Sequence, residues 1–256
     1  MSDRFDVTRD YLALDFDGVL ADSIAECLVV GYNAYAEYSG KDKISDLEEL
    51  GPGWTQESRR LRNFIRYGLD YVYIHFAIAD HTSISTQEDF DRFTDKNHRL
   101  RDRFFQLFYE ERENFSGSQK ERWVSLNPFY KGVSSFLRSY PDLDRLFIIT
   151  TKKLKYVRIL LENRRIHFVR DNMYFADARR SKKQIISELL SRYGISPRHF
   201  YFIDDQVDTL LKTDELGIRC LLAEWGYNNP EQLERAKSAG IQSLTLEDFL
   251  HRFSCH

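Results

Sequence analysis

Two aspartates, Asp15 and Asp17, lie one residue apart where an apolar run ends. The run, residues 11–15, predicts a short buried strand, and Gly18 predicts the loop that follows it. Side chains alternate along a strand, but where the strand breaks into a loop both carboxylates can turn towards one pocket. Such a pair can supply a nucleophile and a general acid. Aspartate is also common in turns for local hydrogen-bonding reasons, so the pair needs support from elsewhere in the chain.

A second group of acids follows another apolar run. Residues 199–203 predict a buried strand that runs directly into Asp204 and Asp205. Carboxylates at a strand end are hard oxygen ligands of the kind that suits Mg²⁺, with capping of the next helix as the alternative interpretation. Two carboxylates about 4 Å apart repel each other by roughly 4 kcal/mol at an effective dielectric of about 20. If Asp15, Asp17 and Asp204 converge, a cation is needed to hold them together.

Two further segments carry groups that suit an anion. Thr150 ends the apolar run 145–149 and precedes a helical pattern, so its hydroxyl and the nearby backbone N–H groups could bind a phosphoryl oxygen. Capping of that helix is the alternative for Thr150. Lys182 and Lys183 open an amphipathic helical pattern, and one of the two ammonium groups could reach a phosphate. A solvated helix face is the alternative for the lysines.

The elements that must position these groups alternate between strand and helix. Strand patterns followed by helical patterns predict a doubly wound, Rossmann-like parallel sheet, and ligands of such sheets bind at the carboxyl ends of the strands. The predicted strands are residues 11–15, 145–149, 173–176, 199–203 and 218–222, and the predicted helices between the later strands are residues 130–139, 154–163 and 182–193.

The middle of the chain has a different pattern. From Ser23 to Val124 strand signals are scarce and apolar residues recur at helical spacing, which predicts an insertion of four or five helices. We therefore expect an α/β core of residues 1–22 and 125–256 and a helical cap of residues 23–124. The insertion leaves the core just after Asp17 and returns before the second strand. Its connections must then lie beside the carboxylate edge, where it could act as a lid.

Composition narrows the class of partner. The formal net charge of −3 provides no basic field for nucleic acid or for an anionic membrane surface. No apolar run approaches the length that crosses a bilayer, and the first residues lack the apolar region of a signal peptide. The three cysteines, Cys27, Cys220 and Cys255, are widely separated, which is typical of free thiols in a reducing compartment. We expect a cytoplasmic protein. Its oligomeric state stays open.

In this order, and with this insertion, the motifs resemble the haloacid dehalogenase (HAD) superfamily of aspartate-dependent phosphohydrolases. The resemblance is to the phosphoglycolate-phosphatase-like branch, whose helical cap follows the first motif, and it spans nearly the whole chain. The segments that carry it are Asp15-Phe-Asp17-Gly18-Val-Leu20-Ala-Asp22-Ser23, Asn127-Pro-Phe-Tyr-Lys-Gly132-Val, Ile149-Thr150-Thr-Lys152, Asp204 with Asp208, Leu216-Gly-Ile218 and Trp225-Gly-Tyr227.

The resemblance implies a catalytic role for four residues. Asp15 would attack phosphorus and become an aspartyl phosphate. Asp17 would protonate the leaving oxygen and later take a proton from water. Thr150 would hydrogen-bond the transferring phosphoryl group, and Lys182 would neutralise that group and the nucleophile, with Lys183 as the alternative lysine. These roles are those of a phosphoric monoester hydrolase.

The resemblance also implies a Mg²⁺ site. The ligands would be the Asp15 carboxylate, the backbone carbonyl of Asp17 and Asp204, with Asp208 supporting them from outside the coordination sphere. Participation of Asp205 stays open. No other cofactor is expected, because neither a P-loop nor a dinucleotide-binding glycine pattern is present.

Substrate choice is expected to depend on the cap. Arg59, Arg62 and Arg66 have the spacing of one helix face and could bind a second anionic group, with a solvated basic face as the other interpretation. We expect a Mg²⁺-dependent phosphatase of a small phosphorylated metabolite. The alternatives are a phosphomutase or phosphonate-cleaving enzyme of the same fold, or a catalytically silent binding or regulatory module.

Overall fold

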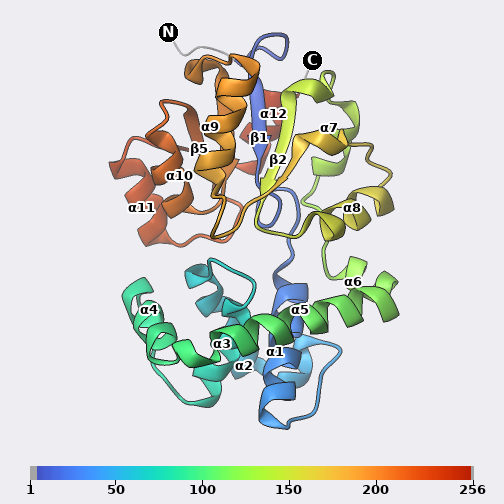
Figure 1. The fold of residues 1–256 in the computed structure, drawn as a ribbon, viewed down its shortest axis with the longest axis vertical. Coiled ribbons are helices and arrows are strands. Elements are labelled where there is room, and N and C mark those ends of the chain that lie inside the picture. Colours follow the sequence, from blue (N-terminus) through green and yellow to red (C-terminus); the bar gives the residue numbers. More distant parts are fainter. Residues whose placement is uncertain (1–4, 255–256) are drawn as a thin grey trace. The chain divides into compact units, whose positions relative to one another are not determined.

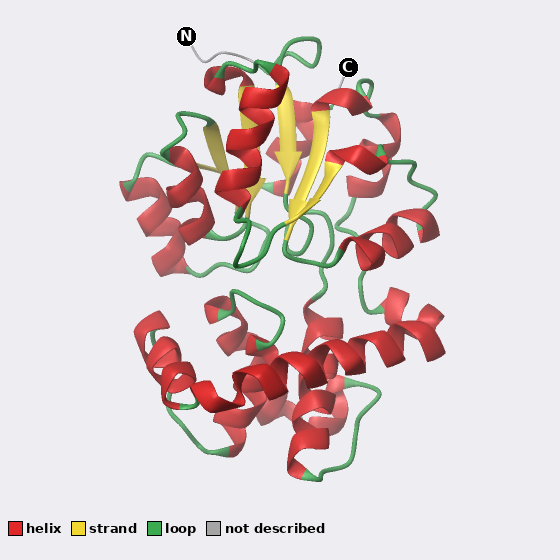
Figure 2. Ribbon diagram, viewed as in Figure 1, coloured by secondary structure: helices red, strands yellow, loops and turns green. Residues whose placement is uncertain are grey.

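The computed structural model of the chain describes residues 5–254. They form two compact units, of which one comprises the chain up to Asp22 and from Phe129 onward, and the other is Ser23–Pro128. The first unit contains the sheet, whereas the second consists of helices and loops, as Figure 2 shows. The predicted fold class, a parallel α/β core with a helical insertion after its first strand, is confirmed.

The sheet has six parallel strands in the order β3-β2-β1-β4-β5-β6. Figure 1 labels β1 and β2, which lie side by side in this sheet. β1 is an inner strand, in which Leu14 lies opposite Ile148 of β2 and Ile203 of β4. All three side chains are fully buried, as expected of apolar strands covered on both faces. The strands are β1 (Tyr11–Leu14), β2 (Leu146–Thr150), β3 (Met173–Phe175), β4 (Phe200–Asp204), β5 (Arg219–Ala223) and β6 (Gln242–Leu244).

Helices cover both faces of the sheet. On one face Phe202 of β4 lies in a buried cluster with Ile185 of α9 and Leu210 of α10. On the other face Tyr201 meets Phe253 of α12 edge to face, with ring centroids 5.8 Å apart. The sheet is therefore doubly wound, as predicted. The helices of this unit are α7 (Val133–Ser139), α8 (Leu154–Asn163), α9 (Lys182–Tyr193), α10 (Val207–Asp214), α11 (Pro230–Ser238) and α12 (Leu246–Phe253).

The helical unit is organised around its first helix. α1 packs against α3 and α5, and a buried ion pair joins α1 to α5: the Arg112 guanidinium donates to both carboxylate oxygens of Glu26, at 2.9 and 3.0 Å. Trp123 of α6 donates its indole N–H to Glu26 at 2.9 Å, so one carboxylate connects three helices. The helices are α1 (Ile24–Ser39), α2 (Pro52–Leu61), α3 (Asp70–Ala79), α4 (Gln87–Lys96), α5 (Arg101–Ser118) and α6 (Lys120–Ser125), more than the four or five expected.

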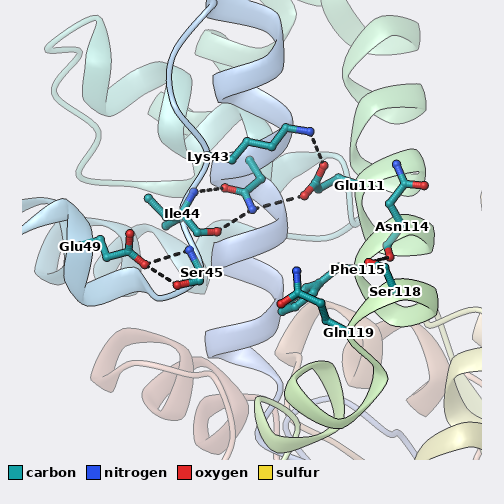
Figure 3. Close-up of a pocket in the computed structure, with 10 residues that line it drawn as sticks. Lys43, Ile44, Ser45, Glu49, Glu111, Asn114, Phe115, Ser118 and Gln119 are labelled. Carbon is teal, nitrogen blue, oxygen red and sulfur yellow. Dashed lines mark hydrogen bonds and ion pairs between the residues drawn. The ribbon is translucent and has the colours of Figure 1, made fainter.

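The helical unit also contains a polar cavity of about 410 Å³ (Figure 3). Two of its charged groups pair with each other, because the Lys43 ammonium donates to Glu111 at 2.8 Å. Asn33 exchanges hydrogen bonds with the backbone of Ile44 and donates to Glu111 at 3.3 Å. These contacts give the loop after α1 a defined conformation beside α5.

Two expectations from composition can be compared with the structure. Cys27 and Cys220 are buried and are not joined in a disulfide, whereas Cys255 lies outside the described residues. Within residues 5–254, no helix has the length and apolar character needed to cross a bilayer.

Candidate active site

Asp15 follows β1 at the carboxyl edge of the sheet. Its backbone N–H donates to Ile203 O of β4 at 3.0 Å, which continues the strand pairing one residue past β1. This contact fixes the backbone from which the side chain projects, and the residue is only 6% exposed. A carboxylate so deeply buried needs a positive partner close by.

Lys182 is that partner. The Lys182 ammonium lies 2.9 Å from Asp15 Oδ1 and donates to Asp204 Oδ2 at 2.8 Å. The lysine is the first residue of α9, and a capping box sets the start of that helix: Ser181 Oγ accepts from Gln184 N, and Gln184 Oε1 accepts from Ser181 N. Local sequence therefore determines where the ammonium enters the site.

Lys183, the alternative lysine, points elsewhere. Its ammonium pairs with Glu215, whose side chain is 66% exposed. Consecutive residues on a helix project about 100° apart, so only one of the two lysines faces the strand ends. The structure places Lys182 with the buried carboxylates.

Three carboxylates meet at this edge. One oxygen from each of Asp15, Asp204 and Asp205 lies within 4.8 Å of the others, and all three residues are buried. Burial raises the pKa of the Asp15 carboxyl to about 8, the Lys182 ammonium opposes the increase, and the charges of Asp204 and Asp205 add to it. Burial acts to lower the pKa of Lys182, but the carboxylates of Asp15 and Asp204 raise it above its ordinary value.

The donor set of this cluster fits a divalent cation. Three ionised carboxylates would outnumber the single ammonium of Lys182. The pKa of Asp15 is raised first by burial, and the charges of Asp204 and Asp205 raise it further. A cation bound by these oxygens would relieve that repulsion, and oxygen ligands are those that Mg²⁺ prefers. The cluster includes Asp205, whose participation the sequence left open.

Two glycines allow Asp205 to approach. A Cβ on Gly18 would lie 2.3 Å from Asp205 Oδ2, and a Cβ on Gly226 would lie 2.3 Å from Asp205 Cβ. The φ angle of Gly18 is +86°, a conformation that residues with a side chain rarely adopt. Asp205 Oδ2 also accepts a hydrogen bond from Tyr227 N at 2.8 Å. The loops after β1, β4 and β5 therefore all meet at the Asp205 side chain.

Asp17 lies beside the cluster, and its partner is a residue to which the sequence assigned no role. Lys152 Nζ donates to Asp17 Oδ1 at 3.0 Å. The Lys152 side chain is fully buried, whereas that of Asp17 is 21% exposed. The sequence signal for Lys152 was its place directly after β2, in the segment that carries Thr150.

Thr150 is the last residue of β2 and is 1% exposed. Its Oγ1 accepts a hydrogen bond from Lys152 N at 3.0 Å, which leaves the hydroxyl hydrogen available for a different acceptor. Because β2 pairs with β1, Thr150 ends at the same sheet edge as the aspartates.

Asp208 is not one of the three clustered carboxylates. It lies in the first turn of α10, where Oδ1 accepts from the Arg235 guanidinium of α11 at 2.7 Å, and its side chain is 39% exposed. This ion pair joins α10 to α11. The supporting role that the resemblance implies for Asp208 stays a prediction.

The three arginines of the helical unit do not share one continuous helix. α2 ends at Leu61, so only Arg59 is on it, while Arg62 begins a short 3₁₀ turn and Arg66 lies beyond that turn. Arg62 is buried, with its guanidinium 5.5 Å from the centre of the Tyr71 ring. Arg66 pairs with Asp91 at 2.6 Å. The expectation of one helix face was therefore wrong, because the helix stops before the pattern does.

Comparison with solved structures identifies proteins of similar fold. No family model and no curated protein matches the chain. A haloacid dehalogenase-like family hydrolase from Streptococcus pneumoniae has 17% identity and a TM-score of 0.59, covering 95% of this chain and 97% of the other. A predicted phosphoglycolate phosphatase from Haemophilus somnus has 16% identity and a TM-score of 0.59, with coverage of 95% and 97%.

A third solved structure, a HAD family hydrolase from Deinococcus radiodurans, contains bound phosphate and sodium. It is 16% identical, with a TM-score of 0.53, and the alignment covers 96% of this chain and 94% of that one. Together these similarities show that the chain has the HAD-like hydrolase fold, with a buried aspartate cluster at the carboxyl edge of its sheet.

Proposed function

We propose that the protein is a Mg²⁺-dependent phosphatase that hydrolyses a small phosphorylated metabolite through an aspartyl phosphate. The observation that carries the proposal is the buried contact of Asp15 with Lys182, beside Asp204 and Asp205. Structural neighbours described as a predicted phosphoglycolate phosphatase and as a hydrolase with bound phosphate support the same reaction class.

In the first half-reaction an oxygen of Asp15 attacks phosphorus and the bond to the leaving oxygen breaks. Asp17 donates its proton to that leaving oxygen, so the product departs as an alcohol. Lys182 balances negative charge at Asp15, and the Thr150 hydroxyl donates to a phosphoryl oxygen. These groups act mainly by position and charge, which is how most catalysis of phosphoryl transfer is achieved.

In the second half-reaction water attacks the phosphorus of the aspartyl phosphate. Asp17, now ionised, accepts a proton from the water, and the bond between phosphorus and the Asp15 oxygen breaks. Inorganic phosphate leaves and both aspartates return to their starting protonation states. Asp15, Asp204 and Asp205 would hold Mg²⁺, which supplies positive charge against the phosphoryl oxygens when it is bound.

The test is phosphate release from a panel of phosphorylated metabolites by the purified protein with Mg²⁺. The matched control is Asp15→Asn, which removes the nucleophile and retains the size of the side chain. We expect release that requires both Mg²⁺ and Asp15. Equal release by both proteins, or none from either, would contradict the phosphatase proposal.

A further inference from the structure

Lys152 is buried at the carboxyl edge of the sheet without a role in the reaction proposed above. Its side chain has no exposed surface, although burial of an ammonium group is unfavourable unless it is paired and hydrogen-bonded. The pairing is with Asp17, through a hydrogen bond of 3.0 Å to Oδ1. A buried lysine directed at a partly exposed carboxylate stabilises one position of that carboxylate.

The same residue also contacts the second polar group of this edge. Its backbone N–H donates to Thr150 Oγ1 at 3.0 Å. Because the hydroxyl accepts this bond, its own hydrogen stays available for another acceptor. Lys152 therefore connects a carboxylate after β1 with a hydroxyl at the end of β2, and these two strands are hydrogen-bonded neighbours.

We propose that Lys152 is a positioning residue whose ammonium holds the Asp17 carboxyl group in the orientation needed for proton transfer to the leaving oxygen. The inference rests on the proposed phosphatase function. It assigns no contact between Lys152 and the substrate, because the side chain acts through Asp17. A proton donor is effective only within hydrogen-bond reach of the acceptor, so loss of the contact should impair the step that needs the proton.

This role can be distinguished from a purely structural one by the leaving group. The leaving group of an alkyl phosphate is a strongly basic alkoxide unless its oxygen is protonated. The leaving group of p-nitrophenyl phosphate is a stable phenolate that hardly needs a proton. The value of kcat/KM covers the steps up to release of this first product. A misplaced Asp17 therefore lowers kcat/KM for the alkyl phosphate more than for the aryl phosphate, while a general loss of folded protein lowers both equally.

The experiment compares wild-type protein with Lys152→Met, which retains the apolar stem and removes the ammonium. The substrates are p-nitrophenyl phosphate and the alkyl phosphate that the wild type hydrolyses best. General acids contribute about 10²- to 10⁴-fold, so we expect at least a ~10-fold larger loss for the alkyl phosphate than for the aryl phosphate. Asp17→Asn should show the same selectivity, and adding Lys152→Met to it should cause little further selective loss.

Lys183→Met is the matched control, because it makes the same change at a lysine that pairs at the surface of α9. Thermal melting verifies that each variant is folded, and Lys152→Gln replaces Lys152→Met if the methionine variant is not. An equal loss on both substrates, or no loss, would overturn the positioning role alone. A wild-type protein inactive on both would overturn the phosphatase proposal and this inference with it.

Discussion

Magnesium binding should displace a proton from Asp15. The pKa of this carboxyl is raised to about 8, because the group is buried and lies beside Asp204 and Asp205. A metal ion would bind the ionised carboxylate, so binding at lower pH must first remove the proton. At pH 7, below this pKa, the carboxyl is mostly protonated, and we expect close to one proton released for each Mg²⁺ bound.

The expected effect on affinity follows from the same value. The ionised fraction of Asp15 falls from about one half at pH 8 to about 1% at pH 6, so the apparent Kd for Mg²⁺ should rise about 50-fold, or ~2.3 kcal/mol. Titration calorimetry at the two pH values measures the change in Kd. Repeating the titration at pH 7 in buffers with different heats of ionisation measures the proton released.

Two substitutions serve as controls for this measurement. Asp15→Asn removes the titrating group, so any remaining Mg²⁺ binding should release almost no proton. Asp91→Asn changes a carboxylate of the helical unit that pairs with Arg66, and it should keep both the pH dependence and the proton release. A wild-type Kd that varies less than about 3-fold between pH 6 and pH 8, with no proton released, would refute the linkage between Asp15 and the metal.

The same linkage predicts how stability changes with pH. The pKa of Asp15 in the folded protein lies above its ordinary value of 3.8. The contribution of this group to stability is therefore fully present below pH 3.8 and is lost as pH rises through about 8. Saturating Mg²⁺ should raise Tm more at pH 8 than at pH 6, and a thermal melt shows whether it does.

Three further substitutions test other parts of the structure. Glu26→Gln removes the carboxylate that pairs with Arg112, whose side chain is only 4% exposed. We expect the free energy of unfolding, measured by urea denaturation, to fall by about 3–5 kcal/mol. A fall of less than ~1 kcal/mol would contradict the importance of the pair. Gly18→Ala places a Cβ 2.3 Å from Asp205 Oδ2 and should weaken Mg²⁺ binding at least ~10-fold, and unchanged affinity would argue against Asp205 as a ligand. Lys183→Met should change phosphatase activity less than ~2-fold, because a surface ion pair contributes at most about 1 kcal/mol.

The strands of the core were predictable because parallel strands buried on both faces are continuous apolar runs. Their ends were less predictable. The run 199–203 predicts a strand that stops before Asp204, yet β4 includes that residue because it pairs with Leu222 of β5. The partner strand sets the end of a ladder, and a sequence pattern does not contain that information. β6, Gln242–Leu244, has no apolar run and was not expected.

The meeting of Asp15, Lys182 and Asp204 could be expected from topology, since parallel strands deliver their carboxyl ends to one edge. The position of Asp205 could not be predicted. Adjacent side chains in a strand point to opposite faces, so only the turn after β4 directs the Asp205 carboxylate towards that of Asp204. In that turn the Asp205 carboxylate accepts a hydrogen bond from Tyr227 N, which is 22 residues away in the chain. The contact of Lys152 with Asp17 was equally hidden, because a long flexible side chain has many possible directions.

The helical unit shows where periodicity alone fails. The spacing of Arg59, Arg62 and Arg66 corresponds to one face only if the helix continues through all three. The helix ends at Leu61, and Ile65 already has an extended backbone. Spacing predicts a shared face, but the length of the helix decides whether that face exists.

The order of the strands has a consequence for how the chain folds. β1 is made first, but it pairs with β2 and β4, which begin at Leu146 and Phe200. Both pairings close loops of more than 100 residues, which slows folding because the entropy of loop closure must be lost before the contacts form. Asp15 therefore leaves the ribosome long before the residues that give its carboxyl group a raised pKa. Until β4 and α9 arrive, the site-forming aspartate is an ordinary carboxylate on an unpaired, aggregation-prone strand.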